Sequence, residues 1–196
     1  MTMQCPDLLF YKSKKYIISD SESEIIETAD FPKVKYCLCE TSCRRGYLAE
    51  YFIEDNKLYG IKFTSEFENG ESESAKLPMN YTGSILAVYV MEGKFMVGFA
   101  DFFSRYLEAD EAYEFYFIDG ELCDVHSLQS AIDEWKNVKQ FITQNNKGKR
   151  KNKNASEVLS NEFELQDRIA IKHLKYDYRY IKLLKKHGLF EAKFMN

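Results

Sequence analysis

A tight hairpin in the middle of the chain constrains the fold most. Residues 113–118 are rich in aromatic side chains, and residues 121–125 follow after only Asp119 and Gly120. An Asp-Gly pair readily takes the positive φ angles that a two-residue hairpin turn requires. We therefore predict two adjacent antiparallel strands here.

Other segments add strands on both sides of this hairpin. Patterns that favour strands lie at residues 8–11, 15–18, 34–40, 47–53 and 58–63. The polar stretch 66–76 indicates either an exposed loop or an extended hairpin tip. The apolar runs 85–91 and 95–103 indicate central strands, or a strand that leads into a buried helix.

The C-terminal third has helical patterns. Ser127 is the predicted N-cap of a helix with an apolar stripe along one side, and residues 156–174 and 178–187 predict two more helices. The predicted fold is therefore α+β: a mostly antiparallel, curved sheet of about six to eight strands with a packing helix, and then a C-terminal basic helical hairpin. We divide the chain into an acidic domain at 1–143, a basic linker at 144–154 and a two-helix tail at 155–196.

Charge is distributed unevenly along the chain. Residues 1–143 carry 14 Lys+Arg and 25 Asp+Glu (14 − 25 = −11), whereas residues 144–196 carry 13 and 6 (13 − 6 = +7), which together give the net −4. The basic tail either docks on its own acidic body or meets an acidic partner such as a phosphate backbone. No apolar run approaches the roughly 18 residues of a membrane helix. With no export signal recognised, we expect a cytoplasmic protein with reduced thiols and no membrane partner.

Two surfaces are candidate binding sites. The first combines acidic and aromatic side chains that suit a basic protein partner: Glu108, Asp110, Glu111, Tyr113, Glu114 and Tyr116. The alternative is nucleic-acid binding by basic residues interleaved with tyrosines in the tail: Lys172, Lys175, Arg179, Lys182, Lys185 and Lys186.

The cysteines raise a third possibility. Cys37 and Cys39 lie two residues apart, so they share one face of a strand and could join Cys123 or His126 in a zinc site. Cys43 precedes two arginines that could lower the pKa of its thiol and activate it as a nucleophile. Paired Cys-x2-Cys knuckles and recognisable catalytic signatures are missing from the sequence, so ordinary core thiols are the favoured interpretation. We predict no cofactor and no metal.

Several motifs together resemble a widespread group of uncharacterised bacterial proteins. The matching residues are Pro6-Asp7-Leu8-Leu9-Phe10-Tyr11, Tyr16, Thr41-Ser42-Cys43, Arg45-Gly46-Tyr47, Ala49, Leu58-Tyr59 and Tyr81-Thr82-Gly83-Ser84-Ile85-Leu86. The core of the signature is Cys43, Arg45, Gly46 and Tyr47, and Arg44 departs from the tryptophan of the group's pattern. The resemblance implies an immunity-type role, in which a small acidic protein neutralises a toxin. We therefore expect a non-enzymatic protein-binding protein.

Overall fold

The computed structural model describes residues 6–21, 25, 48–64, 72–91, 103–146 and 155–175. Its strands are β1 (Leu8–Tyr11), β2 (Lys14–Ser21), β3 (Leu48–Glu54), β4 (Lys57–Thr64), β5 (Ser72–Pro78), β6 (Gly83–Tyr89), β7 (Glu111–Ile118) and β8 (Glu121–Ser127). The helices within these ranges are a 3-10 helix, η3 (Phe103–Glu108), and two α-helices, α1 (Gln129–Asn146) and α2 (Ala155–His173).

The sheet closes on itself. Its strand order is β3-β1-β2-β6-β7-β8-β4-β5, and β3 also pairs with β4. The described strands β3, β1, β2, β6, β7, β8 and β4 therefore form a seven-strand barrel, and β5 adds to β4 beside the ring. Among the described strands, all pairs are antiparallel except β1–β3. Closure between β4 and β8 uses Lys57 opposite Glu121, with the Leu58 N–H donating to the Gly120 carbonyl at 2.9 Å.

The hairpin predicted at residues 113–125 is confirmed, and the strands predicted at 8–11 and 15–18 are present as an antiparallel pair, β1 and β2. β7 and β8 are joined by Asp119 and Gly120, whose φ angles are 49° and 79°. β1 and β2 are joined by Lys12 and Ser13, also with positive φ. Of the polar stretch 66–76, the described part belongs to strand β5. The strand expected at 34–40, the run at 95–102 and the helix expected at 178–187 lie outside the described residues.

β6 lies between two hydrophobic cores. The inner core fills the barrel and includes Ile85 and Ala87, whereas Leu86 and Val88 point outward into a second core beneath the helices. Because both faces are covered, six consecutive residues of β6 are buried. The apolar run that indicated a central strand is thereby explained.

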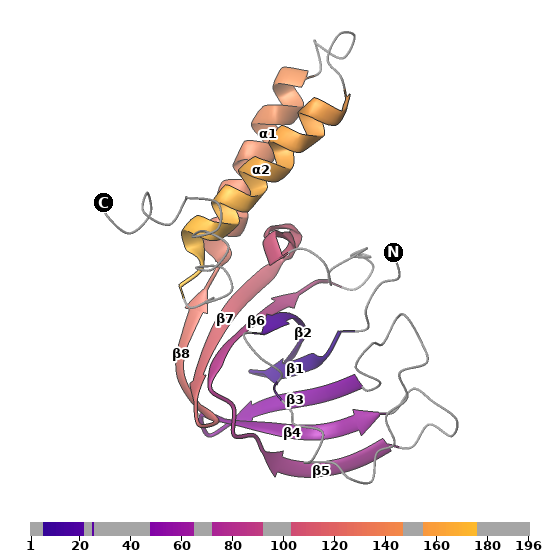
Figure 1. Cartoon of the computed structure of the whole chain (residues 1–196), viewed down its shortest axis with the longest axis vertical. Helices are drawn as coiled ribbons and strands as arrows, with labels where there is room; N and C mark the ends of the chain where they lie inside the picture. Colours follow the sequence, from indigo (N-terminus) through magenta and orange to yellow (C-terminus); the bar gives the residue numbers. More distant parts are fainter. Residues whose placement is uncertain are drawn as a thin grey trace.

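The two α-helices pack on the outer face of the barrel (Figure 1). Trp135 of α1, Ile169 and Ala170 of α2, and Tyr106 and Leu107 of η3 share the outer core. Helices α1 and α2 form a hairpin that extends beyond the barrel. The described part of the predicted tail, residues 155–175, thus packs on the body. Over the part of the chain that the structure describes, neither helix has the length and apolar character needed to cross a membrane.

Candidate functional site

Tyrosines and a carboxylate meet at the rim of the barrel interior. Glu111 begins β7, in the same row as the inward-facing Tyr113 and Phe115, and pairs in register with Tyr89 of β6. Tyr16 of β2 places its ring 6.0 Å from that of Tyr89 and 5.8 Å from that of Tyr113, both edge-on. Edge-to-face packing holds such rings in fixed orientations.

Lys14 occupies this rim. Its ammonium group forms an ion pair with the Glu111 carboxylate and lies 5.1 Å from the centre of the Tyr89 ring. The Tyr16 hydroxyl donates to the other oxygen of Glu111 at 3.3 Å. The hydrogen bond to Glu111 raises the pKa of Lys14. Burial, followed by the negative charge of Glu111, raises the pKa of Tyr16, so its hydroxyl stays protonated and remains a donor.

Three of the predicted acidic residues lie where η3 ends and β7 begins, and we call them, with Met91, whose N–H binds Asp110, the acidic corner: Met91, Glu108, Asp110 and Glu111. Asp110 donates its backbone N–H to the Tyr89 carbonyl at 3.0 Å and accepts the Met91 N–H on its carboxylate at 2.9 Å. Glu108 accepts the Trp135 Nε1–H at 2.8 Å and binds Lys139. Met91 is 56% exposed. An exposed methionine next to a carboxylate is suited to contact with a protein partner.

The other predicted interface residues lie elsewhere. Glu114 is only 1% exposed, and its carboxylate accepts the backbone N–H of Lys175 at 2.7 Å. Glu114 therefore binds the chain just after α2 and is not exposed to a partner. Tyr113 faces the barrel interior, whereas Tyr116 lies on the outer side of β7 in the same row as Glu114, and both tyrosines are half-buried. The alternation of residues in the sequence predicts that β7 has two faces, but only the closure of the barrel decides which face is turned inward.

The basic residues of the tail are described in part. Lys172 forms an ion pair with Glu134 at 3.0 Å, and Lys175 forms one with Asp124 at 2.8 Å. Both cations thus contact the body of the same chain. Arg179, Lys182, Lys185 and Lys186 lie outside the described residues.

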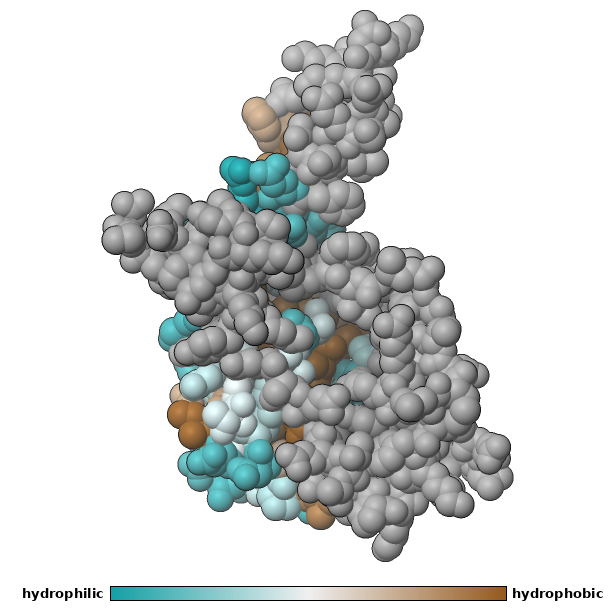
Figure 2. All heavy atoms as spheres, viewed as in Figure 1, coloured by the Kyte–Doolittle hydropathy of each residue, from teal (hydrophilic) through white to brown (hydrophobic). Residues whose placement is uncertain are grey.

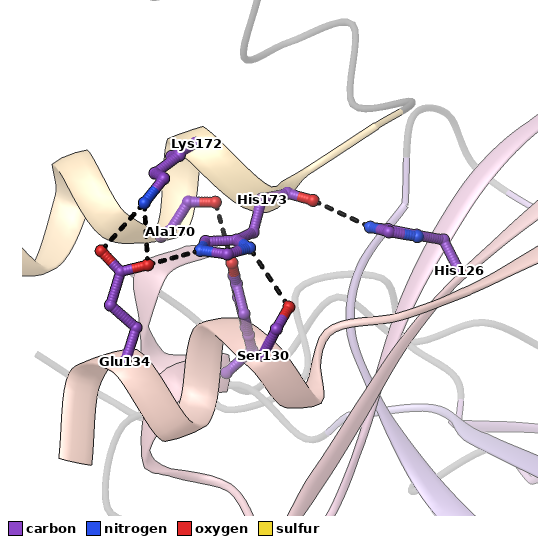
Figure 3. A network of polar contacts seen from close by, with 7 residues as sticks. His126, Ser130, Glu134, Ala170, Lys172 and His173 are labelled. Atoms are coloured by element: carbon purple, nitrogen blue, oxygen red, sulfur yellow. Dashed lines mark hydrogen bonds and ion pairs between the residues drawn. The ribbon is translucent and has the colours of Figure 1, made fainter. Parts of the chain in front are cut away.

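A second polar cluster, which we call the helix clamp, joins the two α-helices (Figure 3). His173 lies 3.3 Å from the Ser130 hydroxyl through Nδ1 and 2.8 Å from the Glu134 carboxylate through Nε2. The His126 ring contacts the His173 carbonyl at 3.0 Å. The hydrogen bond from His173, then that from Lys172, lowers the pKa of Glu134, so this carboxylate stays charged.

The clamp has the residue types of a serine hydrolase, but its setting favours a structural role. Ser130 contacts Nδ1 of the imidazole, and Lys172 shares the carboxylate that would orient a catalytic histidine. The cluster ties the last turn of α2 to the first turns of α1. Sequence analysis did not predict it, because 39 residues separate Glu134 from His173. The available signal was the i, i+4 spacing of Ser130 and Glu134 on one helix face.

The signature and thiol residues are mostly outside the described parts. These are Cys37, Cys39, Cys43, Arg45, Gly46 and Tyr47. Cys123 is exposed on β8, with its thiol 3.5 Å from the Glu121 carbonyl. Within the described ranges, no group of three or more His, Cys, Asp and Glu side chains is arranged to hold a metal ion.

The resembling motifs that are described stabilise the barrel. Asp7 is 3% exposed and accepts the Ala49 N–H at 2.9 Å, which ties the start of β1 to β3. The Tyr81 hydroxyl donates to the Ser84 carbonyl at 2.7 Å, and the Thr82 hydroxyl accepts the Asp119 N–H at 2.8 Å. These residue types therefore have structural explanations here.

Comparison with protein-family models, with curated proteins and with solved structures gave no match to this chain.

Proposed function

We propose that this protein is a non-enzymatic binding protein that recognises a basic protein partner through the acidic corner. The observation that carries the proposal is the exposure of Met91, whose backbone N–H donates to the Asp110 carboxylate and which follows two residues after Tyr89, the register partner of Glu111. A flexible apolar side chain supplies contact area, and the surrounding carboxylates select against acidic partners.

The acidic corner is also well supported. Asp110 is anchored to β6 by a backbone hydrogen bond, and Glu108 is anchored to α1 through Trp135 and Lys139. A surface fixed from both the barrel and the helical hairpin loses little conformational entropy on binding, and a preorganised surface binds more tightly. The resemblance of the sequence to immunity-type proteins suggests a toxin as the partner.

Nucleic-acid binding by the tail is the second candidate. It requires free cations, and the two described candidates, Lys172 and Lys175, contact Glu134 and Asp124 of the same chain. These contacts compete with phosphate, just as Lys139 and Lys14 compete with a basic partner for Glu108 and Glu111. The exposed Met91 is the observation that gives the protein-binding proposal precedence. The predicted two-helix tail at residues 155–196, which differs from the hairpin of α1 and α2, remains part of this alternative.

The test is affinity capture from the source cells, followed by binding measurements with the captured partner after purification. Met91→Lys puts a positive charge beside Asp110 in the acidic corner, and we expect at least about tenfold weaker binding from lost apolar contact and like-charge repulsion. Ile118→Lys is the matched control, because Ile118 is 45% exposed at the opposite end of β7. Over eight residues, β7 separates the two ends by about 23 Å.

Three results would contradict the proposal. Equal binding by Met91→Lys and wild type would show that the acidic corner is not the interface. An equal loss with Ile118→Lys would indicate a nonspecific effect of charge. Capture that nuclease treatment abolishes would favour the nucleic-acid alternative.

A further inference from the structure

We propose that Glu111, Tyr16 and Tyr89 form a subsite for one lysine or arginine side chain of the partner, and that Lys14 occupies this subsite in the free protein. The inference rests on the proposed function, because it names what the acidic corner recognises. Glu111 belongs both to that corner and to the rim of the barrel interior.

The subsite already holds a cation of the required chemistry. The Lys14 ammonium group pairs with Glu111 and lies over the face of Tyr89, with 5.1 Å from the nitrogen to the ring centre. A carboxylate combined with an aromatic ring stabilises a cation through Coulomb attraction and the ring quadrupole. Lys14 therefore indicates that the subsite accepts a positively charged side chain.

The acceptor groups are fixed more firmly than their occupant. Glu111 is held in register by β6, and Tyr16, which donates to its carboxylate, is 2% exposed. The Lys14 side chain, by contrast, is 46% exposed and follows directly after the Lys12-Ser13 turn. It can leave by side-chain rotation alone, without breaking a strand pair. A guanidinium group would fit better than an ammonium group, because it is planar, stacks on tyrosine and can bind a carboxylate with two hydrogen bonds.

A similar arrangement elsewhere provides a comparison. Lys76 pairs with Glu54 and lies over the rings of Phe52 and Tyr59, at 5.2 and 4.6 Å from their centres. There the carboxylate side chain is 50% exposed, against 29% for Glu111. A less exposed carboxylate interacts more strongly with a cation, because water screens it less. We expect the Lys14 position, and not the Lys76 position, to bind an external cation measurably.

The test titrates N-acetyl-arginine amide into the full chain and follows binding by the amide NMR signals of the protein. N-acetyl-citrulline amide is the uncharged control. Lys14→Met should bind the arginine probe about two- to sixfold more tightly than wild type. An exposed ion pair such as Lys14–Glu111 is formed about 1.4 to 5 times as often as it is broken. The probe binds only while the pair is broken, so removing Lys14 should raise the apparent affinity about two- to sixfold. The signals of Tyr16, Tyr89 and Glu111 should shift.

Two control variants make the result specific. Adding Glu111→Gln to Lys14→Met should remove the gain, and Lys76→Met should leave the arginine affinity at the wild-type value. Thermal unfolding of each variant checks that it is folded. No gain in Lys14→Met, or an equal gain for the citrulline probe, would overturn the subsite.

The outcome also separates this inference from the proposed function. If Met91→Lys abolishes partner capture while Lys14→Met shows no gain with arginine, the subsite is refuted and the proposed function stands. If Lys14→Met gains affinity for arginine but no protein partner is captured, the proposed function is refuted. The cation that the subsite binds would then not come from a protein partner.

Discussion

The turn between β7 and β8 should tolerate no side chain at Gly120. Its φ angle is +79°, and an added Cβ would lie 2.0 Å from the carbonyl oxygen of Met79. That oxygen belongs to the backbone, so no flexible side chain can move aside. The Gly120 N–H donates to the Tyr81 carbonyl at 2.8 Å, and the Gly120 carbonyl accepts the Leu58 N–H at 2.9 Å. The turn therefore closes the barrel as well as reversing the chain.

The cost of Gly120→Ala has two parts. The left-handed backbone region costs a non-glycine residue about 1–2 kcal/mol. Relieving the clash shifts the backbone of Gly120 or of Met79, which weakens at least one of the hydrogen bonds that these two residues make, each worth about 1 kcal/mol. The free energy of unfolding should fall by about 2–3 kcal/mol, which for a chain of this size lowers Tm by about 4–12 °C.

Thermal and urea unfolding followed by circular dichroism measure this loss, with Asn56→Ala as the control. Asn56 has a φ of 58° in the exposed turn between β3 and β4, so alanine there meets the backbone cost without the clash that defines Gly120. We expect the control to lose about 1 kcal/mol. If Gly120→Ala loses no more stability than Asn56→Ala, the reasoning from the Met79 carbonyl is wrong.

Two further predictions concern buried and paired carboxylates. Contacts with His173 and Lys172 lower the folded-state pKa of Glu134 below the ordinary 4.5, so its stabilising contribution is present above pH 4.5 and is lost as pH falls toward the folded-state pKa. Glu134→Gln should therefore reduce the loss of Tm between neutral pH and pH 3. The same loss of Tm over this pH range in the variant and in wild type would contradict this. Asp7→Ala leaves the Ala49 N–H without its acceptor and should lower the free energy of unfolding by about 1.5–3 kcal/mol in urea titrations, whereas Asp7→Asn, which keeps an oxygen acceptor, should lose less; equal losses would show that the hydrogen bond is not the cause.

Local structure was predictable from the sequence because it depends on neighbouring residues. The Asp119-Gly120 turn, the strand pattern before it and the apolar stripe of α1 each identify one element, and the described elements follow them. The closed sheet was not predictable. Closure requires the parallel pairing of β1 with β3 and the contact of Lys57 with Glu121, which no local pattern specifies. The acidic residues of 108–114 illustrate the consequence, since only closure decides that Glu111 lines the rim and Glu114 is buried.

The position of the acidic corner follows from the two cores. β6 faces the barrel core with Ile85 and Ala87 and the helical core with Leu86 and Val88, and it leads directly to Tyr89 and Met91. On the face shown in Figure 2, hydrophobic residues are visible near the middle of the barrel, and a hydrophilic patch is visible on the helical hairpin. The acidic corner at the end of β6 is thus held in place from two sides. The barrel fixes Glu111 through the Tyr89 pair, and the hairpin fixes Glu108 through Trp135. A partner at this corner would contact both parts, so its binding should slow hydrogen exchange in α1 as well as in β6, which a partner bound to the barrel alone would not do.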